Sequence, residues 1–252
     1  MGTLSFGLVS VPVKLYSAVT RRTVHFNQIH SLDSGRIHQK HVCSLDGEEI
    51  PMEEIVKGYE IAPDRYIPVE ARELQALEPL FTRTIQVEDF VELHEIDPIY
   101  FDRPYHLVPG IAGAHPYRLL LQAMQDTGKV AIGRIVMRSK ERLVAIRPRG
   151  EALLMLTMSY GDEVNPTTGL RELEGFDEEI DEQELDVARR LVASVAEPFD
   201  IDKYQDTYRD AVLDLIDRKA AGEPIPLSVT PEPPPDSPDV MKALEASLER
   251  VS

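Results

Sequence analysis

Short β-type runs separated by turn-forming residues occupy the chain from Leu4 to about Gly175. The runs are rich in Val, Ile, Phe, Tyr and Thr, and Gly, Pro and Asp lie between them. In chain order they read LSFGLVSVPVKLYSAV, RTIQVEDFVEL, PYHLVP, KVAIGRIVM, RLVAIRP and ALLMLTMSY. Short strands in close succession predict an antiparallel sheet that closes into a barrel. The expected fold class is therefore α+β and mainly β.

One helix is expected within this β region. After Pro116, four apolar residues recur at helical spacing, and Gly128 ends the run. They are Tyr117, Leu120, Leu121 and Met124.

Beyond the β region the apolar period changes from strand-like to helical. Asp181 can cap a helix whose expected apolar face is Leu185, Ala188, Leu191, Val192 and Val195. A second helix is expected after Pro198, with Tyr204, Tyr208, Ala211, Val212, Leu215 and Ile216 as its apolar residues and Arg218, Lys219 and Gly222 at its end. We therefore expect a helical arm over residues 177–222, following a core over residues 1–176.

Residues 223–238 hold seven prolines, which favour an extended, semi-rigid linker. After this linker, Asp239 can cap a short helix over residues 239–252. Val240, Leu244, Leu248 and Val251 would line one face of it. A helix this short is marginal alone, so that face is expected to need a partner. The sequence suggests no internal repeat.

The charge of the chain is unevenly distributed. Its formal net charge is −17, but residues 1–150 hold 18 Lys and Arg against 19 Asp and Glu, whereas residues 151–252 hold 9 against 25. At physiological salt the Debye length is about 8 Å, so distant acids barely cancel the field of a basic surface. The net charge therefore does not exclude a nucleic acid as partner.

Residues 129–149 are the most basic part of the chain, with seven Lys and Arg and a single acid, Glu141. They predict a strand, a turn around Ser139–Lys140–Glu141, and a second strand. Side chains alternate along a strand, which places Arg134 and Arg138 on one face, while Lys140 and Arg142 lie near the tip. Such a hairpin suits a phosphate backbone. An equally weighted alternative is a solvated hairpin whose charges serve only to protect an edge strand from pairing.

Other reactive residue types give weak indications. His38, His41 and Cys43 lie close together, but no second cysteine follows, and ordinary loop residues are favoured over a zinc site. The acidic run 177–186 is explained by the start of a helix. Asp97 and Asp102 are interpreted as turn residues, because no nucleophile or phosphate-binding loop accompanies them. We expect no metal, no cofactor and no catalytic residue.

Three further features bear on the location of the protein. A single cysteine fits a reducing compartment, and no apolar run approaches the length of a membrane span. The N-terminus lacks the pattern of a secretory signal. The protein is therefore expected in the cytoplasm, where a nucleic acid as partner would associate it with the nucleoid.

The order of segments resembles that of the bacterial Ku proteins, homodimeric DNA-end-binding factors of non-homologous end joining. The matching stretches are SFGLVSVPVKLYSA (5–18), IVKGYE (55–60), FVELHEIDPIYFDRPYHLVP (90–109), TGKVAIGRIVMRSKERLVAIRPRG (127–150) and YQDTYRDAVLDLI (204–216). They extend through nearly all of residues 5–222, and EIDPIYFDRPY and KVAIGRIVMR are the most specific.

The resemblance implies a Ku-type β-barrel with an extended bridge and a helical C-terminal arm. Two copies would interlock as a ring that threads onto a broken duplex, without a cofactor or catalysis. It also implies recruitment of the ATP-dependent end-joining DNA ligase through the C-terminal region, here DVMKALEASLERVS. The apolar residues Val240, Leu244, Leu248 and Val251 would form that ligase-binding face.

Three departures from the family pattern qualify this resemblance. The N-terminal extension is short, the paired-cysteine motif of many relatives is reduced to Cys43 with Asp46 in place of its partner, and no lysine-rich tail follows. No zinc is therefore expected, and DNA affinity must come from the ring. The candidate DNA-binding residues are Arg21 and Arg22, before an expected strand VHFNQ (24–28), and Arg36, Lys40, Arg134, Arg138, Lys140 and Arg142.

Functions of two other classes are the alternatives. A metal-dependent nuclease or phosphotransfer enzyme could use Asp97, Asp102 and the acidic arm, and a scaffold could bind protein through its barrel. Incubation with labelled linear duplex and magnesium would separate the three functions. DNA that is shifted but not cut favours the DNA-end-binding protein, cleavage favours the nuclease, and no shift favours the scaffold.

Overall fold

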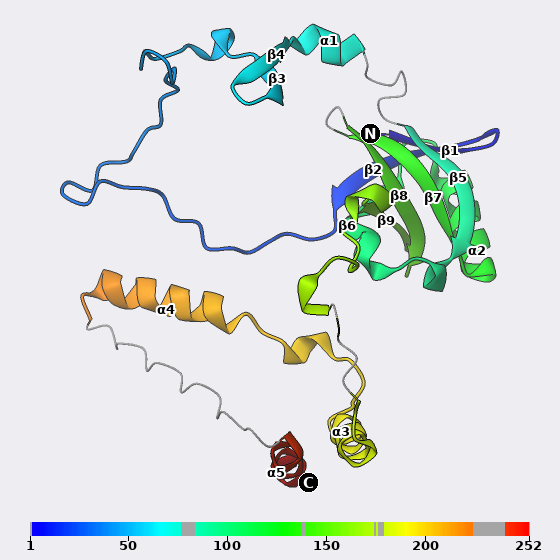
Figure 1. The fold of residues 1–252 in the computed structure, drawn as a ribbon. Coiled ribbons are helices and arrows are strands. Elements are labelled where there is room, and N and C mark those ends of the chain that lie inside the picture. The colour runs from blue at the N-terminus through cyan, green and yellow to red at the C-terminus, as the bar shows by residue number, and fades with distance from the viewer. Residues whose placement is uncertain are drawn as a thin grey trace. The chain divides into compact units, whose positions relative to one another are not determined.

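A closed seven-stranded barrel is the central feature of the computed structural model, which describes residues 2–76, 84–137, 140–173, 175, 179–223 and 240–251, without the side chains of residues 172, 250 and 251. Around the barrel the strands follow the order β1-β2-β6-β9-β8-β7-β5 (Figure 1). They are β1 (Gly2–Phe6), β2 (Val9–Ser17), β5 (Thr84–Glu92), β6 (Phe101–Pro109), β7 (Lys129–Met137), β8 (Lys140–Arg149) and β9 (Ala152–Met158). The predicted barrel is confirmed.

One strand pair departs from the prediction of a fully antiparallel sheet. The barrel closes between β1 and β5, which run parallel, with Leu4 opposite Ile85. All other neighbours in the barrel are antiparallel. The expectation of antiparallel pairing was wrong at this seam. Parallel strands need a long connection between them, and the segment between β2 and β5 makes that pairing possible.

Helix α2 (Ala114–Thr127) adds its apolar face to the barrel interior. The four residues predicted for that face, Tyr117, Leu120, Leu121 and Met124, are all buried and join the same cluster as Val11, Leu107 and Ile146. Gly128 ends the helix in the left-handed conformation, at φ 68°. Burial of each such side chain contributes about 1.5–3 kcal/mol.

Tyr117 also satisfies two backbone groups in the core. Its hydroxyl donates to the Leu107 carbonyl oxygen at 2.6 Å and accepts from the Leu153 N–H at 2.7 Å. Burial raises the pKa of the Tyr117 phenol, so that it stays neutral in both contacts. The hydroxyl therefore joins α2 to β6 and β9.

The strand register divides the barrel into two ends. Ser17 pairs with Tyr105, Phe101 and Leu143 both pair with Met158, and Ile85 pairs with Ile135. The ends of β2, β7 and β9 and the starts of β5, β6 and β8 therefore lie together, and we name this the hairpin end. The β1–β2 turn and α2 lie at the other end, named the helix end.

Between β2 and β5, the described residues 18–76 carry little regular structure. They contain the 3-10 turn η1 (Met52–Glu54), the two-stranded sheet of β3 (Lys57–Ala62) and β4 (Arg65–Val69), and the short helix α1 (Ala71–Ala76). The expected strand over residues 24–28 is wrong, since these residues have no regular secondary structure. Nothing on the barrel pairs with them within the described residues.

Two turns in this segment repeat the same structure thirteen residues apart. The N–H of His30 donates to the Gly35 carbonyl, and the N–H of Cys43 donates in the same way to that of Glu48. Bridges Ile29↔Arg36 and Val42↔Glu49 follow the same offset, and both turns contain Ser-Leu-Asp. Two short turns are much smaller than the units of a repeat architecture, so the absence of an internal repeat stays a prediction.

The C-terminal helices belong to a second compact unit, which comprises residues 22–26 and the described residues after Asn165. Its helices are α3 (Glu182–Ser194), α4 (Thr207–Ala221) and α5 (Val240–Val251), with α3 and α5 in contact. Val187 of α3 is buried, whereas Val192 and Val195 are exposed, so part of the apolar face predicted for α3 is wrong. The linker over residues 223–238 and the cap Asp239 lie outside the described residues, apart from Glu223.

Short 3-10 turns connect several elements. They are η2 (Leu93–Glu95), η3 (Pro98–Tyr100), η4 (Gly161–Glu163), η5 (Arg171–Leu173) and η6 (Ile201–Lys203). Ile96, which follows η2, and Tyr100, the last residue of η3, pack on a second apolar cluster formed by Val130, Ala145 and Met158.

Candidate nucleic-acid interface

The β7–β8 hairpin is the framework of the predicted basic site. Its two strands pair from Ala131↔Ile146 to Met137↔Lys140, so Lys140 and Glu141 belong to β8 and not to the turn as predicted. Gly133 allows β5 to approach, because a Cβ there would overlap the Gln86 carbonyl oxygen. Glu88 of β5, at the register shift between Val87 and Asp89, lies beside Arg134.

The cations of this hairpin lie on both of its faces. Arg134 pairs with Leu143 and Arg142 pairs with Ile135, whose side chain belongs to the barrel core. Because paired residues point to the same side of a sheet, Arg134 lies on the outer face, and Arg142 and Lys140 lie on the other. Arg138 lies outside the described residues, so its expected place beside Arg134 stays a prediction.

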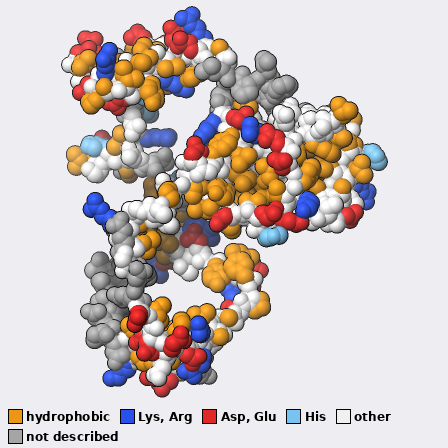
Figure 2. Space-filling view, turned by 45° about the vertical axis from the view of Figure 1, so that its right-hand side comes forward, with side chains coloured by type: hydrophobic (Ala, Val, Ile, Leu, Met, Phe, Trp, Pro, Cys, Tyr) orange, Lys and Arg blue, Asp and Glu red, His pale blue; other side chains and the backbone are white. Residues whose placement is uncertain are grey.

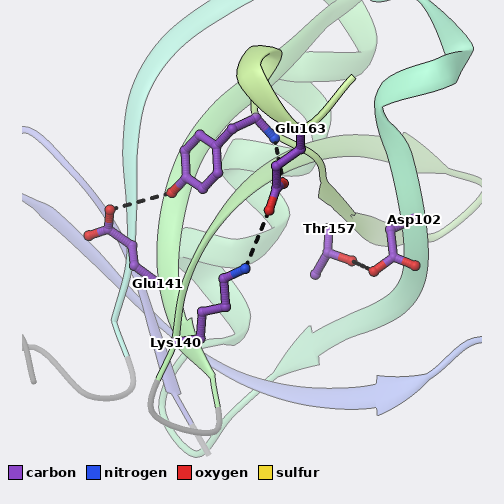
Figure 3. Close-up of polar contacts among 6 residues, drawn as sticks. Asp102, Lys140, Glu141, Thr157 and Glu163 are labelled. Carbon is purple, nitrogen blue, oxygen red and sulfur yellow. Dashed lines mark hydrogen bonds and ion pairs between the residues drawn. The ribbon is translucent and has the colours of Figure 1, made fainter. Parts of the chain in front are cut away.

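Carboxylates from other elements approach the described cations. Lys140 Nζ lies 3.4 Å from Glu163 Oε1, and an Arg134 guanidinium nitrogen lies 3.6 Å from Glu88 Oε2. Figure 3 shows Glu163 of η4 facing Lys140 of β8, while Glu141 accepts a hydrogen bond from the Tyr160 hydroxyl at 3.4 Å. The basic hairpin is therefore less positive than its own sequence indicates.

Two pKa values reflect this arrangement. The Tyr160 N–H, which donates to Glu163 Oε2 at 2.9 Å, lowers the pKa of the Glu163 carboxyl, and the Lys140 ammonium lowers it further. Burial raises the pKa of the Tyr160 phenol, as does the nearby Glu141. Glu163 is therefore ionised, and Tyr160 is neutral, at neutral pH.

Arg103 is a cation of the hairpin end that the sequence analysis missed. A register shift between Phe101 and Pro104 interrupts the β6–β9 pairing, and such bulges redirect side chains. Arg103 and Asp102 line a cavity of about 560 Å³ together with Arg21, one of the predicted residues. Its position in the specific stretch EIDPIYFDRPY was the available signal.

Asp102 is held by short-range partners within this cavity wall. The hydroxyl of Thr157, a buried residue, lies 3.3 Å from Asp102 Oδ2, and the Arg103 guanidinium lies 3.7 Å from its other oxygen. The backbone N–H of Arg103 donates to the Thr157 hydroxyl at 3.0 Å. Asp102 is thus a structural residue of the bulge. Asp97 likewise caps η3 by accepting from the Ile99 N–H at 2.9 Å.

The other predicted DNA-binding residues are dispersed. Arg22 and Arg36 are exposed, Arg22 belongs to the second compact unit, and Lys40 forms an ion pair with Glu49 at 2.6 Å. The structure therefore brings Arg21, Arg134, Lys140 and Arg142 to the hairpin end and does not bring Arg36 or Lys40 there.

The residues predicted to bind a ligase are partly covered by the chain itself. Leu244 and Leu248 of α5 are half-buried, and α5 contacts α3, whereas Val240 is 59% exposed. The side chain of Val251 lies outside the described residues. The role of this face stays a prediction.

Metal ligands and membrane spans are both absent from the described residues. No group of three or more His, Cys, Asp and Glu side chains there could hold a metal ion, and the turns bearing His38, His41 and Cys43 are no exception. None of the helices in that same part of the chain has the length and hydropathy needed to cross a membrane.

Asp181 caps α3 through the N–H groups of Gln183 and Glu184, as expected for the acidic run.

Comparison with known proteins gives one consistent result. Residues 5–187 match the family model described as the Ku70/Ku80 beta-barrel domain. Over 98% of the chain, it is 44% identical to the non-homologous end joining protein Ku of Anaeromyxobacter sp., of which it spans 83%, and 41% identical to that of Symbiobacterium thermophilum, of which it spans only 61%. Over 99% of the chain, it is 36% identical to the protein of the same name from Archaeoglobus fulgidus, of which it spans 97%.

Proposed function

Because the chain belongs to the Ku family, we propose that it binds the ends of double-stranded DNA without sequence preference and acts in non-homologous end joining. The observation that carries the proposal is the match to proteins of that name along almost the whole chain. The cations gathered at the hairpin end support it. Contacts to phosphate position a protein on DNA without reading its bases.

The binding form that we propose is a homodimeric ring around the duplex. A ring holds DNA by its topology, because dissociation requires sliding off an end. A chain with a net charge of −17 can therefore form a long-lived complex without depending on charge alone. Arg21, Arg103, Arg134, Lys140 and Arg142 are the described cations that we assign to phosphate contacts from the barrel. Arg22, Arg36, Lys40 and Arg138 are further candidates.

A comparison of linear and circular duplexes of equal length tests the ring. We expect linear DNA to be bound and retained in high salt, covalently closed circles to be bound weakly, and neither to be cut in the presence of magnesium. Light scattering during size-exclusion chromatography should give the mass of two chains. Equal retention of circles would contradict threading, and cleavage would favour an enzyme instead.

Recruitment of the ATP-dependent end-joining ligase is the second part of the proposal. We assign it to α5, on which Val240, Leu244 and Leu248 recur every four residues and so share one side of the helix. Deletion of residues 239–252 should abolish stimulation of the ligase and leave binding to DNA ends unchanged. The matched control replaces Glu245 and Glu249, exposed acids of the same helix, with Gln and should keep stimulation. Equal stimulation by the truncated chain would assign recruitment elsewhere.

A further inference from the structure

The hairpin end carries acids placed directly against the cations that the proposed function uses. Each of two cations has one carboxylate partner from a separate element: Glu163 of η4 for Lys140, and Glu88 of β5 for Arg134. No such partners were foreseen from residues 129–149, which contain only Glu141. An explanation for them has to lie in the site itself.

These ion pairs are open to an incoming ligand. The side chains of Lys140 and Glu163 are 60% and 46% exposed, and those of Arg134 and Glu88 are 48% and 35% exposed. Exposed pairs of this kind contribute little to folding stability. Their most direct effect is therefore on what the cations can bind.

Glu163 is fixed by the backbone before any cation contributes. Its Oε2 accepts from the Tyr160 N–H at 2.9 Å, and this contact leaves Oε1 directed at Lys140. The same hydrogen bond is the main cause of the lowered pKa of Glu163. The carboxylate is thus ionised and positioned independently of Lys140.

We propose that Glu163 and Glu88 compete with DNA phosphate for Lys140 and Arg134, so that DNA binds the hairpin end only by displacing both carboxylates. This inference rests on the proposed function and names a restraint on the same site. A carboxylate and a phosphate oxygen accept from the same N–H donors, so a cation paired with one is not available to the other. A ligand with a single phosphate gains little binding free energy from this exchange. A duplex contacts many cations at once and therefore displaces both acids.

Replacement of each carboxylate by its neutral amide tests this directly. Glu163→Gln and Glu88→Gln should each increase affinity for a short blunt-ended duplex about two- to fivefold, the range of an exposed ion pair. Together they should give about tenfold, because the two pairs share no partner. The salt dependence of binding should become steeper by up to about 0.9 per freed cation. In the Glu163→Gln variant the amide oxygen still offers an acceptor to the Tyr160 N–H.

Glu92→Gln is the matched control. Glu92 forms an ion pair with Lys129 whose side chains are 40% and 39% exposed, but this pair lies at the helix end of the barrel. The substitution changes the net charge by the same amount. We expect unchanged affinity, and a gain equal to that of Glu163→Gln would overturn the proposal, since the effect would then come from total charge.

A double-mutant cycle separates local competition from a general effect at the hairpin end. In a Lys140→Ala background, Glu163→Gln should raise affinity much less than in the wild type, because the ion-pair partner is absent and only the weaker effect of Glu163 on Arg142 remains. Thermal melting of each variant confirms that the barrel is intact. A wild-type chain that binds duplex, with no gain from Glu163→Gln, overturns this inference alone. Absence of duplex binding by all variants overturns the proposed function with it.

Discussion

The two ends of the barrel differ in chemistry although the same strands form both. At the hairpin end, Arg103, Arg134, Lys140 and Arg142 lie among Glu88, Asp102 and Glu163. At the helix end, α2 adds its apolar residues to the core, and an apolar groove of about 460 Å³ is lined by Phe6, Val9, Phe90 and Leu119. Figure 2 shows hydrophobic side chains gathered over the barrel, with charged side chains beside them.

This difference suggests a division of roles within one small domain. Packing at the helix end stabilises the barrel, whereas the hairpin end carries solvated charges that contribute little to folding. A substitution at the helix end should therefore change folding stability and leave DNA affinity unchanged, and a substitution at the hairpin end should do the reverse. The following predictions test that separation, beginning with the largest expected effect.

Removal of the hairpin cations should give the largest change. Replacing Arg134, Arg138, Lys140 and Arg142 with Ala should weaken binding to DNA ends about a hundredfold or more and reduce the log-salt slope by up to about 3.6, since each phosphate contact contributes about 0.9. Binding measured by anisotropy over a range of salt concentrations checks this. The melting temperature should barely change, and an unchanged slope would exclude the hairpin from the interface.

Truncation of Met124 should give the opposite pattern. This α2 side chain is 2% exposed within the main core, and Met124→Ala should lower the free energy of unfolding by about 2–5 kcal/mol because it leaves a cavity. Denaturant unfolding measures the loss. The folded fraction should bind DNA as the wild type does, and reduced affinity at temperatures where the variant is fully folded would show that the ends are coupled.

Arg103 should contribute a smaller share of DNA affinity. Arg103→Ala removes one guanidinium from the cavity that it shares with Arg21, and we expect about three- to tenfold weaker binding with a slope reduced by about 0.9. Arg118→Ala is the matched control, because Arg118 is an exposed arginine on α2 at the helix end. Equal losses for the two variants would show that binding does not distinguish the ends.

The smallest expected effect is on the titration of Glu163. Lys140→Ala should raise the pKa of this carboxyl part of the way to its ordinary value, because the Tyr160 N–H remains as the larger cause. The lowered pKa favours the folded state above the ordinary pKa, and that contribution is lost as the pH falls through the folded value. Carboxyl-carbon NMR titration of both proteins measures the shift. An unchanged pKa would show that Lys140 does not act on Glu163.

Local pattern was enough to predict the parts of the fold that pack locally. The face of α2 was predicted correctly because helical spacing and a terminating Gly128 are visible in sequence. The pair β3–β4 was missed because nearly all of its residues are exposed, so no alternation of apolar and polar residues shows it. On α3, Val187 is buried and Val192 is exposed, and the helix contacts α5, a neighbour that no local spacing reveals.

The candidate site shows the same limit more sharply. The basic character of residues 129–149 was visible, and so was the hairpin. The acids that face its cations come from β5 and η4, and no local pattern reports a contact between residues so distant in the chain. Arg103 was missed because the bulge that turns it into a cavity depends on the pairing of β6 with β9.

The parallel seam between β1 and β5 has a consequence for how the chain folds. Leu4 meets Ile85 only after the whole intervening segment has been synthesised, and pairings between residues so far apart form late and slowly. The entropic cost of that closure grows by only about 0.6 kcal/mol for each doubling of the loop. The connection between β2 and β5 can therefore be lengthened or shortened with little penalty to the closure of the barrel.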